Sequence, residues 1–523
     1  FILPPGVAII GQVVQSNITT TSFDLSWTTN NTGDSQVNFG LTTALGDSVE
    51  VADNVTDHTV TVSGLEPGTI YYCSVTSTNP DGSSTSTVRP YATKSLSSGD
   101  IRVYFNRSVD VSYATTEQAI SLGANSNDSI AAYISRANET IEMALYNFTD
   151  DPVIANAINA RYDAGVQIRV VADGSTAQLG LSLLNPNIPV LERINTTGTG
   201  IMHNKFLIID ADNADNAWVW TGSMNWTDGN MYNDFNNIII FQDQSIARGY
   251  RLEFEEMWGG SGAFPGSASG NFGSQKTSNT PTQYVLGPND IKVESYFSPT
   301  DNANGAIIKT MQTTDANLDY AVLAFTRQDI ADAIIAEDDL FLVLVRGIIE
   351  QTSDPASEYT YLQTAGQDVH SHEGVTYDLH HKYCIVDHST LDSDPTVLTG
   401  SHNWSSAAQT TNDENTVVVH DARVANLYLQ EFMARWGVTG VEENGSSDMS
   451  VFPNPAPQTA WIGLPRGEGN ATVTIVDMNG AQVKQLNIQE GMNQVVLEGM
   501  PSGTYVFHVQ SANRTWNKTV VVQ

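Results

Sequence analysis

With 523 residues, the chain is too long for one hydrophobic core, because domains usually contain about 100–200 residues. Its formal charge of −35 repels polyanions at long range and counts against tight binding of duplex DNA, which requires many surface Lys and Arg side chains. No apolar run approaches the roughly 18–20 residues that span a bilayer, so we expect no transmembrane segment.

Residues 1–95 alternate short strand-like runs with turn clusters, which predicts a β-sandwich. The dipeptide Asp81-Gly82 predicts a hairpin within it. Residues 65–71 resemble the fibronectin type III signature, in which a tyrosine hydroxyl, here that of Tyr71, pins the corner between two strands. This resemblance implies a spacer or weak adhesion module with Trp27 in its core.

From residue 100 the pattern changes to alternating strands and helices. Two predicted strands, at residues 140–148 and 166–172, flank a helix. Asp150 and Asp151 begin this helix, with Pro152 in its first turn. This βαβ unit implies helices packed on a mostly parallel sheet.

The same pattern then occurs a second time. The repeated elements are Tyr104-Phe105-Asn106 and Tyr296-Phe297-Ser298, and two amphipathic helices with Phe and Trp four residues apart, Phe254/Trp258 and Phe432/Trp436. A Gly/Ser-rich stretch at residues 259–278 would link the two halves. We therefore expect two copies of one fold facing each other, at residues 100–265 and 288–440.

A compact β segment follows a second predicted linker, residues 442–448. Its landmarks are Val451-Phe452-Pro453-Asn454-Pro455-Ala456, a predicted hairpin turn at residues 477–480, and Pro501-Ser502-Gly503-Thr504-Tyr505. This arrangement resembles the C-terminal sorting domain of the type IX secretion system of the Bacteroidetes. The resemblance implies that residues 446–523 are an export address read by that machinery, and that the protein is secreted or placed on the cell surface. The alternative is a plain β-sandwich appendage.

The expected fold class is therefore multidomain: a β-sandwich, a duplicated α/β body of two mixed sheets flanked by helices, and a C-terminal β-sandwich. Cys73 and Cys384 fall in different predicted domains, so we expect no disulfide between them.

One motif with functional side chains is present in both halves of the α/β body. The first copy is His203-Asn204-Lys205, Asp210 and Gly222-Ser223-Met224-Asn225-Trp226, and the second is His380-His381-Lys382, Asp387 and Gly400-Ser401-His402-Asn403-Trp404. The histidine and the aspartate are seven residues apart in both copies. Because strand side chains alternate with period two, His and Lys share one face, as do Ser and Asn.

These side chains suit a phosphodiester. Two lysines can neutralise the non-bridging oxygens, while amides and hydroxyls donate hydrogen bonds as charge grows in the transition state. Two histidines can divide the work of nucleophile and general acid. Because no carboxylate cluster with metal-ligand spacing accompanies them, we expect catalysis without a metal ion or other cofactor.

The repeated HxKx4D…GSxN motif resembles the phospholipase D superfamily over about residues 100–440. The resemblance implies a covalent phosphohistidine formed by one histidine, with His203 as nucleophile and His380 as acid, although the order could be reversed. It implies that the phosphate is held by Lys205, Lys382, Asn225 and Asn403, with Ser223 and Ser401 nearby, and that Asp210 and Asp387 are structural supports.

The family usually has an acidic residue shortly after GSxN that orients a histidine. Glu414 fits this place in the second half. The aligned residue of the first half is Asn236, with Asp234 as a stand-in.

Several other side chains have two interpretations. His381 should point away from His380, into the protein body. His402 lies inside the motif and borders the predicted pocket. Tyr146 and Phe148 either line a lipid or base pocket or pack in the core. His370 and His372, near Glu373, are expected to be solvated rather than to bind a metal.

We therefore expect a secreted phosphodiesterase, with phospholipid cleavage to phosphatidic acid narrowly ahead of a nuclease of the same superfamily. The halves are short, as in compact nuclease-like members, whereas the negative charge favours the lipid. A non-catalytic surface adhesin is the alternative from another class. The expected partners are a phospholipid or nucleic-acid substrate and the type IX secretion machinery; peripheral membrane contact and the oligomeric state stay open.

Overall fold

The computed structural model describes residues 6–194, 200–266, 270–338, 343–390, 393–436, 450–452, 459–464, 469–477, 481–489, 491–497, 499–512 and 514–522. The chain divides into two compact units, Phe1–Gly440 and Val441–Gln523, which are described separately.

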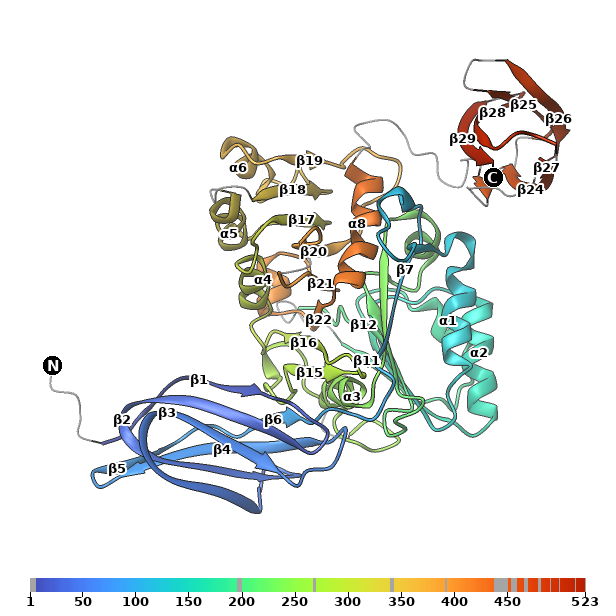
Figure 1. Ribbon diagram of the computed structural model, residues 1–523. Helices are drawn as coiled ribbons and strands as arrows, with labels where there is room; N and C mark the ends of the chain where they lie inside the picture. The colour runs from blue at the N-terminus through green and yellow to red at the C-terminus, as the bar shows by residue number, and fades with distance from the viewer. Residues whose placement is uncertain are drawn as a thin grey trace. The chain divides into compact units, whose positions relative to one another are not determined.

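The first unit begins with a β-sandwich (Figure 1). Its strands are β1 (Ile9–Ser16), β2 (Ser22–Gly40), β3 (Asp47–Ser63), β4 (Ile70–Asn79), β5 (Gly82–Thr85) and β6 (Arg89–Ala92). The Tyr71 hydroxyl accepts a hydrogen bond from the backbone N–H of Glu66 at 3.0 Å, and Trp27 is 3% exposed in the core. Both features expected of the fibronectin type III resemblance are confirmed, and Asp81-Gly82 does form the hairpin between β4 and β5.

The next part is an eight-stranded mixed sheet in the order β11-β10-β9-β12-β13-β14-β7-β8. Its elements are β7 (Asp100–Phe105), β8 (Ile120–Ser121), α1 (Ser126–Ile134), β9 (Thr140–Leu145), α2 (Pro152–Asp163), β10 (Gln167–Asp173), β11 (Val190–Arg193), β12 (Lys205–Ile209), β13 (Trp218–Gly222), β14 (Asn237–Gln242) and α3 (Gln244–Trp258). The predicted βαβ unit is β9-α2-β10, and Asp151 caps α2 by accepting from the N–H groups of Val153 and Ile154. The sheet is less parallel than that unit suggested, because β12, β13 and β14 pair antiparallel.

The second half repeats this sheet in the order β15-β16-β22-β21-β20-β17-β18-β19. Its elements are β15 (Gln283–Leu286), β16 (Ile291–Ser298), α4 (Ala303–Met311), β17 (Asn317–Val322), α5 (Gln328–Asp338), β18 (Leu344–Ile349), α6 (Tyr359–Thr364), β19 (Val369–Ser371), β20 (Lys382–Val386), β21 (Thr396–Gly400), α7 (Ser406–Thr410), β22 (Glu414–His420) and α8 (Ala422–Trp436). α3 and α8 contribute to one buried core that both halves share, whereas each half has a second core under its outer helices.

Polar side chains also join the two halves. Two equivalent groups cross the junction, Asn415 with Thr221 and Tyr250, and Asn237 with Thr399 and Tyr428. The Asn415 amide donates to Thr221 at 2.8 Å, and the Asn237 carbonyl oxygen accepts from Thr399 at 2.8 Å. Because every member is buried and hydrogen-bonded, these groups fix the register of one half against the other.

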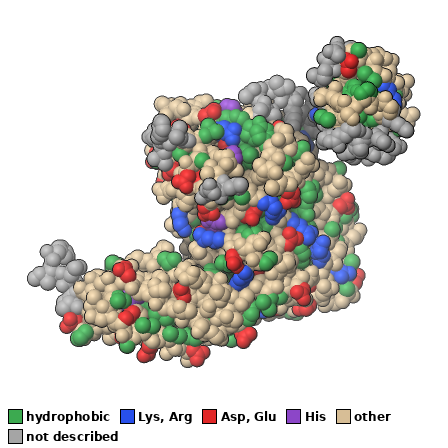
Figure 2. Space-filling model, in the orientation of Figure 1, with side chains coloured by type: hydrophobic (Ala, Val, Ile, Leu, Met, Phe, Trp, Pro, Cys, Tyr) green, Lys and Arg blue, Asp and Glu red, His purple; other side chains and the backbone are tan. Residues whose placement is uncertain are grey.

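The surface charge is distributed unevenly. On the face shown in Figure 2, acidic side chains are scattered over the N-terminal sandwich, while Lys and Arg side chains gather over the duplicated body. The net charge of the chain therefore does not prevent local positive regions.

The second unit consists of two small antiparallel sheets, β23-β24-β27 and β26-β25-β28-β29. Its strands are β23 (Ser450–Phe452), β24 (Thr459–Leu464), β25 (Ala471–Asp477), β26 (Gln482–Ile488), β27 (Gly491–Val496), β28 (Gly503–Ser511) and β29 (Thr515–Val522). The predicted linker at 442–448, the Pro-Asn-Pro run at 453–455 and turn residues 478–480 lie outside the described residues. Within the described parts of both units, no helix is long and apolar enough to cross a membrane, and both cysteines are buried and free.

Candidate active site

Each HxK motif enters its strand beside the backbone of the other half. Met202 bridges to Asp413, and the His203 N–H then donates to the Asp413 carbonyl at 2.9 Å. In the equivalent place, the His380 N–H donates to the Phe235 carbonyl at 2.9 Å. Because β12 and β20 start at these crossings, the two motifs meet at the junction of the halves.

Glu414 is the central acceptor on the His203 side. Its Oε2 lies 2.7 Å from Nδ1 of His203 and also accepts from the Ser401 hydroxyl at 2.7 Å. Its Oε1 accepts from the Asn412 amide at 3.2 Å. Burial works to raise the pKa of Glu414, but His203 and Lys205 outweigh it and the pKa is lowered, so the carboxylate is ionised.

Asn236 takes the corresponding place on the His380 side. Its Oδ1 lies 2.9 Å from Nδ1 of His380 and accepts from the Ser223 hydroxyl at 2.9 Å. Its amide NH2 donates to the Asn230 carbonyl, which fixes the orientation of the amide. Asp234 takes another position, where it accepts from the Asn230 amide at 2.7 Å, so Asn236 and not Asp234 is the partner of the histidine.

Each of the two lysine side chains donates a hydrogen bond to the backbone of its own motif. Lys205 Nζ donates to the His203 carbonyl, and Lys382 Nζ to the His380 carbonyl, each at 2.8 Å. Each lysine is 1% exposed. Burial lowers the pKa of Lys205 to about 7, and burial followed by repulsion from Lys205 lowers the pKa of Lys382 well below its ordinary value.

Burial and neighbouring charges also shift the pKa values of the two histidines. Burial lowers the pKa of His203, with Glu414 opposing this effect. Burial, then Lys382, Lys205 and His203, lower the pKa of His380 well below its ordinary value. Because groups from both halves act on His380, the four basic side chains lie close together, with the ionised Glu414 beside His203 as a countercharge.

The GSxN segments complete the site. Gly222 and Gly400 have φ angles of +142° and +150°, and a Cβ there would meet the carbonyl oxygens of Asn237 and Asn415 at 2.3 and 2.2 Å. Only glycine therefore lets each strand turn here. Among the described residues, the Oδ1 atoms of Asn225 and Asn403 are buried without a hydrogen-bond partner. These amides can reorient toward a bound polar group.

Asp210 and Asp387 lie away from this cluster, just past the far ends of β12 and β20. Asp210 accepts from the backbone N–H groups of Asn138, Glu139 and Thr140, and Asp387 from those of Asp315, Ala316 and Asn317. Their φ angles are +46° and +54°, a conformation that Asp tolerates. Asp210 thus ties the end of β12 to the start of the neighbouring strand β9, and Asp387 ties the end of β20 to the start of β17.

The structure also places the other side chains that the sequence singled out. His381 points into the body, 2.9 Å from Glu431, as expected. The Tyr146 ring lies 4.6 Å from the His203 ring, whereas Phe148 packs in the core. His402 is buried near Glu414, and burial lowers its pKa to about 4. The expectation of solvated histidines is wrong for His372, which is buried beside Glu350, whereas His370 is partly exposed and stacks on Trp436.

The sequence did not indicate a buried ionic network beside the site. Lys276 lies between the carboxylates of Glu253 and Asp413, and Arg193 pairs with Asp413. Asp413 directly precedes Glu414 and contributes the carbonyl that His203 contacts. Lys276 lies in the stretch interpreted as a linker, and a lone Lys in a Gly/Ser-rich segment gave no signal of burial. Among the described residues, no group of three or more His, Cys, Asp or Glu side chains could hold a metal ion.

The protein is therefore duplicated and has a composite site, because each α/β half contributes a histidine, a lysine and a GSxN segment to one buried cluster. Residues 130–258 and 307–436 match the family described as cardiolipin synthase, PLD-like domain. Residues 8–92 match the fibronectin type III domain, and residues 450–523 match the secretion system C-terminal sorting domain. The chain is a member of the phospholipase D superfamily, and its sorting domain indicates export by the type IX secretion system.

Curated relatives match about a quarter of the chain. Mitochondrial cardiolipin hydrolase of Xenopus tropicalis is 31% identical over 125 residues, covering 24% of this chain and 56% of that protein. Phospholipase D of Rickettsia felis is 33% identical over 126 residues, covering 23% of this chain and 58% of that protein. The chain thus spans about half the length of these curated relatives. Phosphatidylserine synthase of Haemophilus influenzae, a solved structure, aligns with 14% identity and a TM-score of 0.44 over 64% of this chain and 86% of that one.

Proposed function

We propose that the protein is a secreted phosphodiester hydrolase that cleaves a phospholipid to phosphatidic acid and a free head group, without a metal ion. The observation that supports it most is the convergence of His203, His380, Lys205 and Lys382, drawn from two halves, on one buried site. A phosphodiester anion suits such a cluster, because its two non-bridging oxygens can each accept a hydrogen bond from one of the two ammonium groups.

In the first step, Nε2 of His203 attacks phosphorus and the bond from phosphorus to the head-group oxygen breaks. His380 gives its proton to that oxygen, so the head group leaves as an alcohol. In the second step, water attacks the phosphohistidine, the phosphorus–nitrogen bond breaks, and His380 takes a proton from the water. Phosphatidic acid is then released and both histidines return to their starting state.

The different partners of the two histidines support this division of roles. The Glu414 carboxylate, 2.7 Å from Nδ1 of His203, makes that ring more nucleophilic and stabilises the positive charge of a phosphohistidine. The neutral Asn236 amide offers His380 no such charge, so its imidazolium is the stronger acid. His203 is therefore the nucleophile and His380 the general acid.

The lysines and amides bind the phosphate itself. Lys205 and Lys382 hold the non-bridging oxygens, and Asn225 and Asn403 donate to them once their amides have turned. Ser223 and Ser401 act indirectly, because each donates its hydroxyl proton to the acceptor that orients a histidine.

The lipid is preferred over a nucleic acid for two reasons. The relatives named cardiolipin hydrolase and phospholipase D act, by their names, on lipids. The formal charge of −35 also disfavours a polyanionic substrate. A secreted endonuclease is the second candidate, supported by the short halves; an adhesin is disfavoured by the complete set of motif residues.

Hydrolysis of bis-(p-nitrophenyl) phosphate in the presence of EDTA tests the enzyme class. We expect activity in the full chain and none in His203→Ala or His380→Ala, with Asp215→Ala, an exposed site, as the matched control. A parallel assay on phosphatidylcholine vesicles and single-stranded DNA tests the substrate. Cleaved DNA with untouched vesicles would reject the phospholipase and leave the nuclease; no cleavage of any diester would reject both.

A further inference from the structure

A second polar cavity lies where the N-terminal sandwich meets the first half of the body. Its volume is about 550 Å³, and it is lined by Tyr72 of β4, Glu142 of β9, Arg169 of β10 and residues of α3. Glu142 is three residues along β9 from Leu145, which pairs with the motif residue Lys205. The cavity therefore lies toward the other end of the sheet and shares no residue with the HxK site.

The floor of this cavity contains an unpaired donor and an unpaired acceptor. The side chains of Arg169 and Glu142 are 4% and 2% exposed and form an ion pair at 3.1 Å. Even so, Nε of Arg169 and Oε2 of Glu142 have no hydrogen-bond partner among the described residues. Because buried polar groups are almost always paired, this donor and acceptor indicate a polar ligand that supplies both complements.

The walls are held by contacts between the two domains. Arg248 donates to the Gly68 carbonyl at 2.6 Å, and the Ser245 hydroxyl donates to the Thr93 carbonyl at 2.7 Å. Arg251 and Arg248 both pair with Asp212 at the rim. These contacts form the walls of the cavity in advance.

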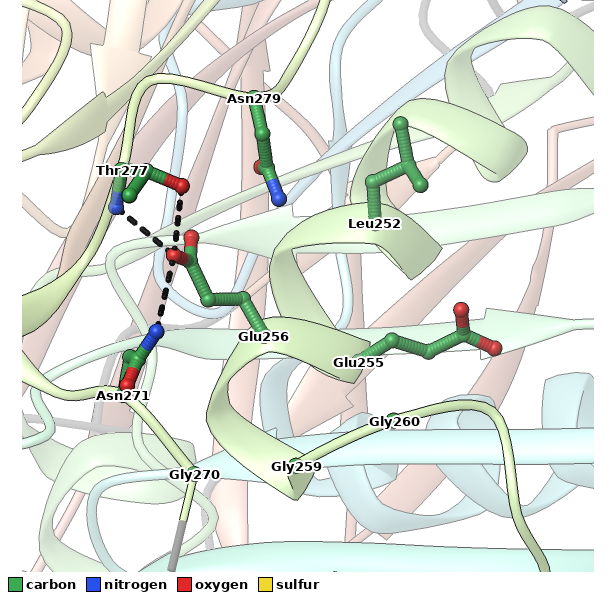
Figure 3. Close-up of a pocket in the computed structure, with 9 residues that line it drawn as sticks. All are labelled: Leu252, Glu255, Glu256, Gly259, Gly260, Gly270, Asn271, Thr277 and Asn279. Carbon is green, nitrogen blue, oxygen red and sulfur yellow. Dashed lines mark hydrogen bonds between the residues drawn. The ribbon is translucent and has the colours of Figure 1, made fainter. Parts of the chain in front are cut away.

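Of two consecutive acidic residues of α3, Glu255 lines this cavity and Glu256 does not. Figure 3 shows a neighbouring pocket that both residues line, in which their side chains point away from each other. Oε1 of Glu256 accepts from Thr277 and Asn271, so the following loop occupies that side. Glu255 instead lies 3.3 Å from Arg169 and contributes to the cavity lining.

The charges of the cavity balance. Its lining has three guanidinium groups and three carboxylates, the latter from Glu142, Asp212 and Glu255. The lining therefore has no net charge that would attract an anion or a cation. The lining also has an aromatic ring, that of Tyr72, and the aliphatic side chains of Leu41 and Ile70. A neutral ligand with many hydroxyl groups and one apolar face satisfies all of these features.

We propose that this cavity binds a neutral saccharide. One sugar hydroxyl accepts from Nε of Arg169, a hydroxyl donates to Oε2 of Glu142, and the apolar face of the sugar ring packs on Tyr72. The site is independent of the phosphodiesterase reaction and lets the sandwich serve as part of a glycan-binding surface.

The test uses the full-length chain on an array of neutral monosaccharides and disaccharides, with sialyllactose and glucosamine as charged probes. We expect binding of at least one neutral probe, and calorimetry should then give its Kd. Tyr72→Ala should weaken this binding at least about tenfold, because the apolar face of the sugar loses the ring on which it packs. Glu142→Gln should weaken it by a similar factor, because a neutral amide replaces the charged acceptor. Ser261→Trp, at an exposed position on the rim, should block it by filling the entrance.

Tyr113→Ala, an exposed tyrosine outside the cavity, is the matched control and should keep the wild-type Kd. Thermal melting and bis-(p-nitrophenyl) phosphate hydrolysis should be unchanged in Ser261→Trp, which separates loss of binding from misfolding. Absence of binding to every neutral probe, preference for a charged probe, or wild-type affinity in Ser261→Trp would each overturn the proposal.

Discussion

The Glu414 carboxylate lies 2.7 Å from Nδ1 of His203, although the two residues belong to opposite halves of the duplicated body. Replacement of Glu414 by Gln keeps the shape of the side chain and removes its charge. Because the carboxylate stabilises positive charge on the ring, we expect kcat on bis-(p-nitrophenyl) phosphate to fall about 10²–10⁴-fold. Steady-state kinetics at fixed pH measures this change.

Glu373→Gln is the matched control, since Glu373 is exposed and its contacts lie in a separate loop of the second half. Its kcat should equal that of the wild type. A Glu414→Gln protein that is folded and retains the wild-type kcat would remove the carboxylate from the mechanism.

Asn236 gives His380 a neutral partner at 2.9 Å, and exchange for Asp would make the two half-sites alike. A carboxylate favours the imidazolium form, so the pKa of His380 should rise. The general acid must be protonated, and the alkaline limb of kcat/KM against pH should therefore move upward by about one pH unit. The raised pKa also makes His380 a weaker acid, so the maximum rate should fall.

The control for this pH profile is Asn159→Asp, which adds the same charge on α2, where the amide bonds to the Leu183 carbonyl and the Asn185 backbone. Its alkaline limb should not move. An unmoved limb in Asn236→Asp would show that His380 is not the group whose protonation the reaction requires.

Local sequence rules predict which residues belong to each half of the site, but not which residues of the other half they contact. Strand alternation is enough to place His203 and Lys205 on one face, and corner geometry is enough for Tyr71. The pairing of His203 with Glu414 spans 211 residues, and spacing within one motif says nothing about which half provides the acceptor. Lys276 was missed for the same reason, because its burial depends on Glu253 and Asp413, which come from distant segments.

Burial lowers the pKa of Lys205 to about 7, which makes anion binding depend on pH in the neutral range. An ammonium group is charged below its pKa and neutral above it. The inhibition constant of dimethyl phosphate, a diester that keeps one negative charge, should therefore be lowest near pH 6. It should rise by up to about tenfold per pH unit above 7.

Lys205→Arg provides the comparison, because a guanidinium group stays charged throughout this range. Its inhibition constant should change much less between pH 7 and 9, whatever its absolute value. Equal slopes in the two proteins would show that Lys205 is not the titrating group.

Asp210 accepts three backbone N–H groups, each at 2.8 Å, and we expect it to act on stability rather than on chemistry. Asp210→Asn keeps a residue type that tolerates the φ of +46° but weakens these charge-assisted bonds. The loss should be about 2–3 kcal/mol, seen as a lower melting temperature of the duplicated body. The activity that remains below the transition should have a wild-type KM, because the hydrogen-bond partners of the Asp210 carboxylate among the described residues are backbone N–H groups and the Asn216 amide. Asp215→Asn, on the exposed part of the same loop, should melt like the wild type. If Asp210→Asn leaves the melting temperature unchanged but abolishes activity, this carboxylate takes part in the reaction. A purely structural residue could change activity only by destabilising the end of β12.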